Sequence, residues 1–190
     1  MRFPLRLLVL LCAMLTGVAF AQSPANSTVS KAKNPISFSY DAQHDQVIPS
    51  GVQLRPAAIS DASITPTTGM VVVTINIHTM SHFRRDTSYH CALTVLGGEL
   101  DTTNAIVSGG IDTAVGLAKR NGSDSLSCTL TIPYEWTILP DPGSTRGAAL
   151  AFGVAAIDEG TVVRSTLQVD GVEPLPPNGT TSTFAFNVTL

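Results

Sequence analysis

The sequence predicts an all-β protein folded as an antiparallel β-sandwich. Short segments in which apolar and polar residues alternate recur along the chain, and a period of two is typical of half-buried strands. Clusters of Gly, Pro, Asn and Asp separate these segments, as they do in sheets built from many short strands. Only 13% of the 190 residues are charged, against about 25% in an average soluble domain, and 44% are hydrophobic. This composition excludes an intrinsically disordered chain, which is polar and highly charged.

The first 21 residues have the features of a signal peptide. Arg2 and Arg6 form a basic start, residues 7–20 are almost all apolar, and Ala19-Phe20-Ala21 has the small-x-small pattern of a cleavage site. The apolar run is shorter than the roughly 20 residues of a membrane-spanning helix. We therefore expect a secreted or periplasmic protein, with no membrane span in its mature chain.

The rest of the chain divides into a predicted disordered linker over 22–35 and a single β-sandwich domain over 36–190. The linker is polar and has no periodicity. In the domain, eight segments predict strands because their apolar residues alternate: Ile36–Tyr40, Gly51–Leu54, Met70–Thr79, Tyr89–Leu96, Leu126–Ile132, Ala149–Ile157, Thr161–Val169 and Thr183–Thr189.

One segment, residues 112–121, predicts a short helix instead. Asp112 stands at an N-cap position, and the basic residues Lys119 and Arg120 fall in the last turn. Gly116 weakens a helix in this segment, so a loop or a strand is the alternative.

The predicted architecture has Greek-key, immunoglobulin-like connections between its strands. The domain contains two cysteines, Cys91 and Cys128, at a spacing that invites comparison with immunoglobulin domains. The sequence departs from that family, because Trp136 follows Cys128 instead of lying between the cysteines, and Leu126 stands where the family has a tyrosine. We therefore predict the sandwich architecture without assigning the family.

The two cysteines predict a disulfide bond. A third cysteine, Cys12, is removed with the signal peptide, and export brings Cys91 and Cys128 into an oxidising compartment. Both fall on the apolar side of alternating segments, so both should point into the core. A bridge that closes this loop of 37 residues contributes on the order of 3–4 kcal/mol in the chain-entropy model.

A group of histidine and methionine residues is the candidate metal site. If the apolar residues of Met70–Thr79 face the core, His78, Met80 and His82 lie together on the opposite face. Pairing of Ile77 with Cys91 in one antiparallel register would also set His78 opposite His90. Imidazole and thioether groups bind copper, and imidazole binds zinc. The alternatives are a solvated strand face and a patch that responds to pH.

No catalytic or nucleotide-binding motif is present, and a pI near 5.7 excludes a nucleic-acid partner bound through a basic face. We therefore expect a non-enzymatic exported protein without a cofactor, acting as a structural or binding module for a protein or glycan at the cell surface or in the periplasm. The first alternative is a periplasmic copper- or zinc-binding protein that uses His78, Met80, His82 and His90. The second is a hydrolase whose site has no sequence motif.

Overall fold

The computed structural model describes residues 36–190, apart from 53–64, 81–82, 103–105 and 141. The predicted signal peptide and linker lie outside the described residues. Those described form strands, turns and loops with no helix, so the all-β prediction is confirmed. They belong to one compact unit, Lys31–Leu190.

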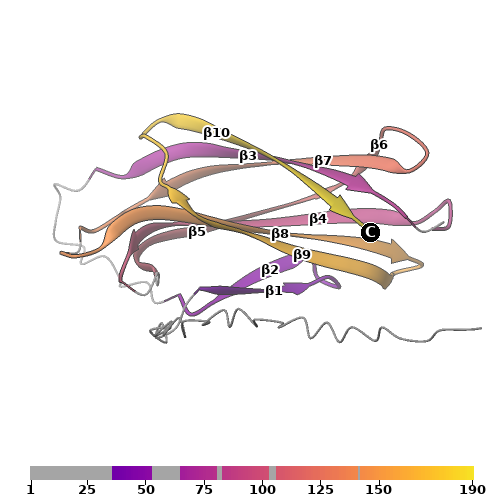
Figure 1. Ribbon diagram of the computed structural model, residues 1–190, viewed down its shortest axis with the longest axis horizontal. Coiled ribbons are helices and arrows are strands. Elements are labelled where there is room, and N and C mark those ends of the chain that lie inside the picture. Colours follow the sequence, from indigo (N-terminus) through magenta and orange to yellow (C-terminus); the bar gives the residue numbers. More distant parts are fainter. Residues whose placement is uncertain (1–35, 53–64, 81–82, 103–105, 141) are drawn as a thin grey trace, which may run out of the picture. The chain divides into compact units, whose positions relative to one another are not determined.

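Two four-stranded sheets pack face to face (Figure 1). The first sheet has the order β10 (Thr180–Thr189), β3 (Thr67–His78), β7 (Ser125–Trp136) and β6 (Lys119–Arg120). The second sheet has the order β5 (Ile106–Leu117), β4 (Ser88–Leu100), β8 (Thr145–Asp158) and β9 (Thr161–Pro174). All pairs within these two sheets are antiparallel except β10 with β3, which is parallel.

Period-two alternation fills the space between the sheets, as the sequence predicts. On β3 the inward residues are all at most 4% exposed: Val71, Val73, Ile75 and Ile77. Every second residue of β7, from Leu126 to Trp136, is also buried. Burying one such aliphatic side chain stabilises the fold by about 1.5–3 kcal/mol, so these two strands fix which face of the first sheet turns inward.

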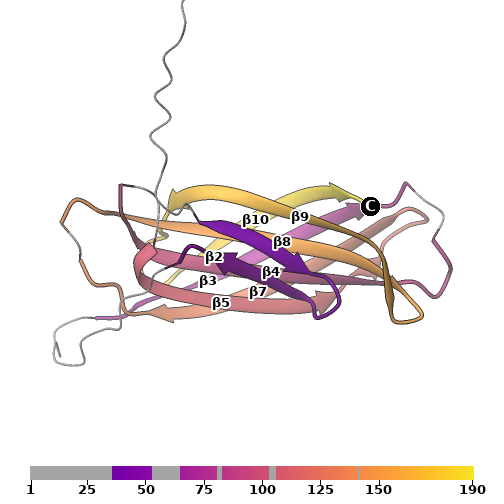
Figure 2. The same cartoon turned by 90° about the horizontal axis from the view of Figure 1, so that it is seen from below.

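A hairpin forms a third layer on the outer face of the second sheet (Figure 2). It consists of β1 (Ser37–Asp41) and β2 (Gln46–Ser50). The Tyr40 ring lies so close to Gly153 of β8 that any Cβ there would overlap it. The Thr94 hydroxyl of β4 donates a hydrogen bond of 2.6 Å to the Val47 carbonyl oxygen. This cover explains why β4 and β8 are buried on both faces along most of their length.

Two sequence predictions are corrected here. Residues 112–121 are not a helix: β5 runs through Ile106–Leu117 and pairs with β4, and β6 follows. The Asp112 carboxylate accepts a hydrogen bond from the Trp136 indole instead of capping a helix, because tertiary pairing outweighs weak local signals. Of the second predicted strand, Gly51–Leu54, the first two residues are not in a strand, since β2 ends at Ser50 and Gly51 has a φ of 80°, and the last two lie outside the described residues.

A tight turn joins β8 to β9. Asp158 pairs with Thr161, which leaves a two-residue loop of Glu159 and Gly160. Their φ angles of 48° and 76° are those of a type I′ turn, whose twist matches that of the flanking strands.

Candidate functional site

The structure does not bring His78 opposite His90, as the predicted histidine and methionine patch requires. The pairing of Ile77 with Cys91 is wrong, because β3 and β4 lie in different sheets and Ile77 pairs with Leu126 and Val188. His78 and His90 do point away from the core, but from the outer faces of opposite sheets. They therefore cannot share one metal ion.

The other two residues of the predicted patch are Met80 and His82. Met80 lies beyond the end of β3 and is 73% exposed, and His82 is outside the described residues. Within the described part of the chain, no three His, Cys, Asp or Glu side chains are close enough to hold a metal ion.

His90 belongs instead to a chain of hydrogen bonds that joins the hairpin to the second sheet. Its Nδ1 atom is 2.7 Å from Oδ2 of Asp45, in the turn between β1 and β2. Its Nε2 atom is 3.1 Å from Oγ of Ser88, two residues earlier on the same face of β4. The His90 and Asp45 side chains are each 26% exposed, so the group is half-buried. We call Asp45, His90 and Ser88 the Ser88 relay.

Sequence reasoning missed the Ser88 relay. Ser88 and His90 are two residues apart in a strand, a spacing that would place them on one face, but Asp45 comes from a separate layer of the fold. Only the packing of the hairpin on β4 brings the carboxylate to the imidazole.

The hairpin offers a second His–Asp pair that is well exposed. His44 Nδ1 lies 2.7 Å from Asp41 Oδ2, with the two side chains 70% and 41% exposed. The backbone N–H of Gln43 also donates to Asp41. Hydrogen bonding to His44 is the main reason why the pKa of Asp41 is lowered. This pair serves as an internal comparison for the Ser88 relay.

The two cysteines face each other between the sheets. Cys91 of β4 and Cys128 of β7 are both buried, as the sequence predicts. Both are free thiols in this structure, with the two residues 2.7 Å apart at their closest, longer than a disulfide bond of about 2.05 Å. The hydrogen bond to Cys128, followed by burial, raises the pKa of the Cys91 thiol.

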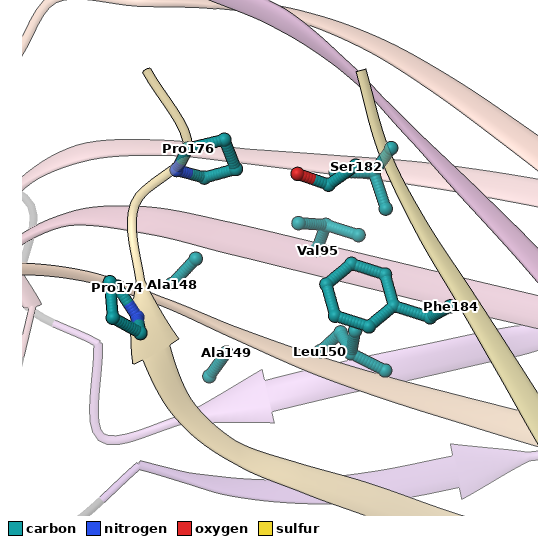
Figure 3. Close-up of a pocket in the computed structure, with 9 residues that line it drawn as sticks. Val95, Ala148, Ala149, Leu150, Pro174, Pro176, Ser182 and Phe184 are labelled. Atoms are coloured by element: carbon teal, nitrogen blue, oxygen red, sulfur yellow. The ribbon is translucent and has the colours of Figure 1, made fainter. Parts of the chain in front are cut away.

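An apolar pocket of about 130 Å³ opens between the sheets beside β9 and β10 (Figure 3). Val71, Val95 and Leu150 come from the packed faces, and Phe184 and Ser182 come from β10. The remaining lining residues are small or cyclic: Ala148, Ala149, Pro174 and Pro176. Ser182 carries the one polar side chain of this lining, so the pocket suits an apolar group.

A larger groove of about 510 Å³ lies between the hairpin and the outer face of β5. Residues His44 to Pro49 form one wall, and residues Thr113 to Val115 form the other. The exposed apolar side chains Ile48 and Val115 belong to this surface.

No protein-family model, curated protein or solved structure matches the chain. None of the described residues forms a helix that is long and apolar enough to cross a membrane.

Proposed function

We propose that this protein is an exported, non-enzymatic binding module, and that it binds an extended segment of a partner protein at the edge of its first sheet. The observation that carries the proposal is the apolar pocket between the sheets, which opens beside β10. A pocket of this kind, with few polar groups, is typical of a binding site rather than of a packed core.

The neighbouring strand supports an extended peptide as the occupant. Among the described strands, β10 pairs with β3 alone, so its other edge carries backbone groups that no strand of this sheet uses. A peptide that adds to a sheet edge gains main-chain hydrogen bonds, and pockets for alternate side chains select its sequence. Ser182 and Phe184 both line the pocket, and a side chain opposite them would point the same way.

The volume of the pocket indicates what the partner presents. An apolar cavity of about 150 Å³ holds one benzene molecule, so about 130 Å³ accepts a small aromatic or branched aliphatic side chain. The apolar lining disfavours a glycan, which needs many hydrogen bonds. We therefore propose a protein partner with an apolar residue at the matching position of an extended segment.

The test is an NMR titration of the mature protein with the peptide acetyl-Thr-Val-Phe-Val-Thr-amide. We expect shift changes on β10 and around the pocket. Ala148→Leu, which fills the pocket, should raise the Kd at least tenfold. Replacing the Phe of the peptide by Lys should weaken binding by a similar factor. Thr131→Leu adds apolar volume on the exposed face of β7, which β3 separates from β10, and should leave the Kd unchanged.

Either of two results would contradict this proposal. One is the absence of shift changes around the pocket at millimolar peptide. The other is equal binding by the Ala148→Leu variant and the native protein.

The expected compartment supports a disulfide between Cys91 and Cys128. We propose that the two thiols oxidise during export, since they lie side by side and an oxidising compartment favours the bridge. The bridge would link β4 of the second sheet to β7 of the first, and so hold the two sheets together at the core.

A further inference from the structure

The Ser88 relay has the order of groups that activates a serine hydroxyl. A nucleophile next to a base, with a third group that orients the base, is the general arrangement for covalent chemistry at serine. Here Ser88 Oγ lies 3.1 Å from His90 Nε2, and His90 Nδ1 lies 2.7 Å from Asp45 Oδ2. The relay lies on the outer face of the second sheet, apart from the pocket between the sheets.

The hydrogen bonds fix the direction of proton transfer. The Asp45 carboxylate can only accept, so Nδ1 of His90 carries the proton and donates to it. In the neutral imidazole Nε2 then has a free lone pair, which accepts the Ser88 hydroxyl proton. The Ile157 carbonyl oxygen competes for that proton at the longer distance of 3.4 Å.

The position of Asp45 costs free energy, which suggests a specific role for it. Its φ of 53° is uncommon for a residue other than glycine. Its second carboxylate oxygen, Oδ1, is buried and has no hydrogen-bond partner among the described residues. An unsatisfied buried acceptor is destabilising, and such features gather where a side chain is held for function.

We propose that Ser88 is an activated nucleophile that accepts an acyl group from an ester. Ser88 Oγ attacks the ester carbonyl carbon while His90 Nε2 takes the hydroxyl proton. The bond from the carbonyl carbon to the alkoxide then breaks, and the proton on His90 passes to the leaving alkoxide. The products are an ester on Ser88 and a free alcohol. Asp45 acts as a positioning residue that holds the imidazole and stabilises its protonated form.

The surroundings of Ser88 predict a slow release of the acyl group. Rapid turnover needs hydrogen-bond donors aimed at the oxyanion, and each is worth roughly 100- to 1,000-fold in rate. The group placed next to Ser88 Oγ is instead the Ile157 carbonyl, an acceptor, and the Arg84 guanidinium is engaged by the carboxylates of Asp158 and Glu159. We therefore expect about one acyl group per chain and little turnover, in keeping with the non-enzymatic function proposed above.

A fluorophosphonate probe tests the nucleophile directly on the mature protein. Intact mass should show one adduct per chain, and peptide mapping should place it on Ser88. With p-nitrophenyl acetate we expect a burst of about one equivalent of p-nitrophenolate, followed by a slow steady state. Ser88→Ala should remove both the adduct and the burst.

The exposed His–Asp pair provides the matched control. Asp45→Asn should lower the labelling rate constant by about 100-fold or more, because the amide no longer stabilises the imidazolium. Asp41→Asn makes the same change in the His44–Asp41 pair, which has no serine beside it, and the labelling rate constant should stay within twofold of the native value. Melting curves identify any variant that fails to fold, and Ser88→Ala removes only a half-buried hydroxyl.

Three outcomes overturn the proposal. The first is an adduct that persists in Ser88→Ala. The second is equal slowing of labelling by Asp45→Asn and Asp41→Asn. The third is the absence of both adduct and burst in the native protein. None of these outcomes depends on peptide binding at β10, so each of the two proposals can be contradicted without affecting the other.

Discussion

At the scale of single residues, Trp136 shows how tightly the two sheets fit. Its ring stacks on Tyr134 with centroids 4.2 Å apart, and its indole N–H donates to Asp112 Oδ2 at 2.6 Å. A Cβ atom at Gly97 or at Gly110 would overlap the ring. The glycines therefore provide the space in which the only tryptophan is 4% exposed.

Gly110→Ala should lower the free energy of unfolding by about 1–3 kcal/mol, the range for overpacking a well-filled core. The added methyl group must displace the Trp136 ring and strain its bond to Asp112. Urea unfolding followed by tryptophan fluorescence measures the loss. Gly122→Ala is the control, because its nearest neighbour would be 3.8 Å away and the change should stay within about 0.5 kcal/mol. Equal stabilities of the two variants would contradict this account of Trp136.

The sequence alone predicts whether a strand residue faces the core or the solvent, but not which residues it contacts. Alternation correctly predicts that Ile77 and Cys91 face inward and that His78 and His90 face outward. It could not tell that β3 and β4 belong to different sheets, because side-chain parity is the same for any partner strand. The Ser88 relay could not be predicted for a similar reason, since Asp45 belongs to the hairpin and no sequence pattern places the hairpin on β4.

At the scale of elements, the hairpin of β1 and β2 is the part of the fold with the most distinctive chemistry. It lies on the small side chains of β8, and the Tyr40 ring lies over Gly153. The Tyr40 hydroxyl is buried and has no hydrogen-bond partner among the described residues. Burial, and then the carboxylate of Asp45, raises the pKa of this hydroxyl above its usual value near 10.

Tyr40→Phe should stabilise the protein at neutral pH by about 1 kcal/mol, because it removes an unsatisfied hydroxyl. The raised pKa in the folded state means that Tyr40 stays neutral in the fold after it ionises in the unfolded chain. The native protein should therefore lose stability as the pH rises above about 10, and Tyr40→Phe should lose less. Urea unfolding between pH 8 and pH 11 measures both effects. Parallel stability curves for the two proteins would contradict the raised pKa.

The strands themselves were mostly predictable, and the exceptions have physical causes. Seven of the eight predicted segments overlap strands, because long alternating runs such as β3 and β7 carry strong signals. β5 was missed because Gly109, Gly110 and Gly116 interrupt its alternation, and because Asp112 and Lys119 resemble helix ends. Its pairing with β4, which no local pattern reveals, decides its conformation.

At the scale of the whole molecule, Cys91 of the second sheet and Cys128 of the first contact each other in the core. Both thiols are buried, at 0% and 2% exposed, so an oxidant reaches them slowly once the core has closed. The bridge should therefore form while the chain is still folding, before the core closes.

If the protein is exported, as proposed above, it should contain the Cys91–Cys128 bridge, and reduction should lower its Tm. A bridge worth on the order of 3–4 kcal/mol corresponds to about 10 °C in a domain of this size. Calorimetry with and without reductant measures the shift, and a Cys91→Ser, Cys128→Ser double variant should not respond. Two titratable thiols in the protein isolated after export and denatured without reductant would contradict the bridge.

The path of the chain after β5 makes the two sides of the sandwich unequal. β5 runs along the second sheet, and only Ala118 separates it from β6, which pairs with β7 of the first sheet. The chain thus passes from the second sheet to the first with almost no interruption along this edge of the sandwich. On the opposite edge, a short proline-rich connector joins β9 of the second sheet to β10 of the first, and the apolar pocket opens beside it. The partner segment proposed above would therefore bind at the edge of the sandwich opposite β5 and β6.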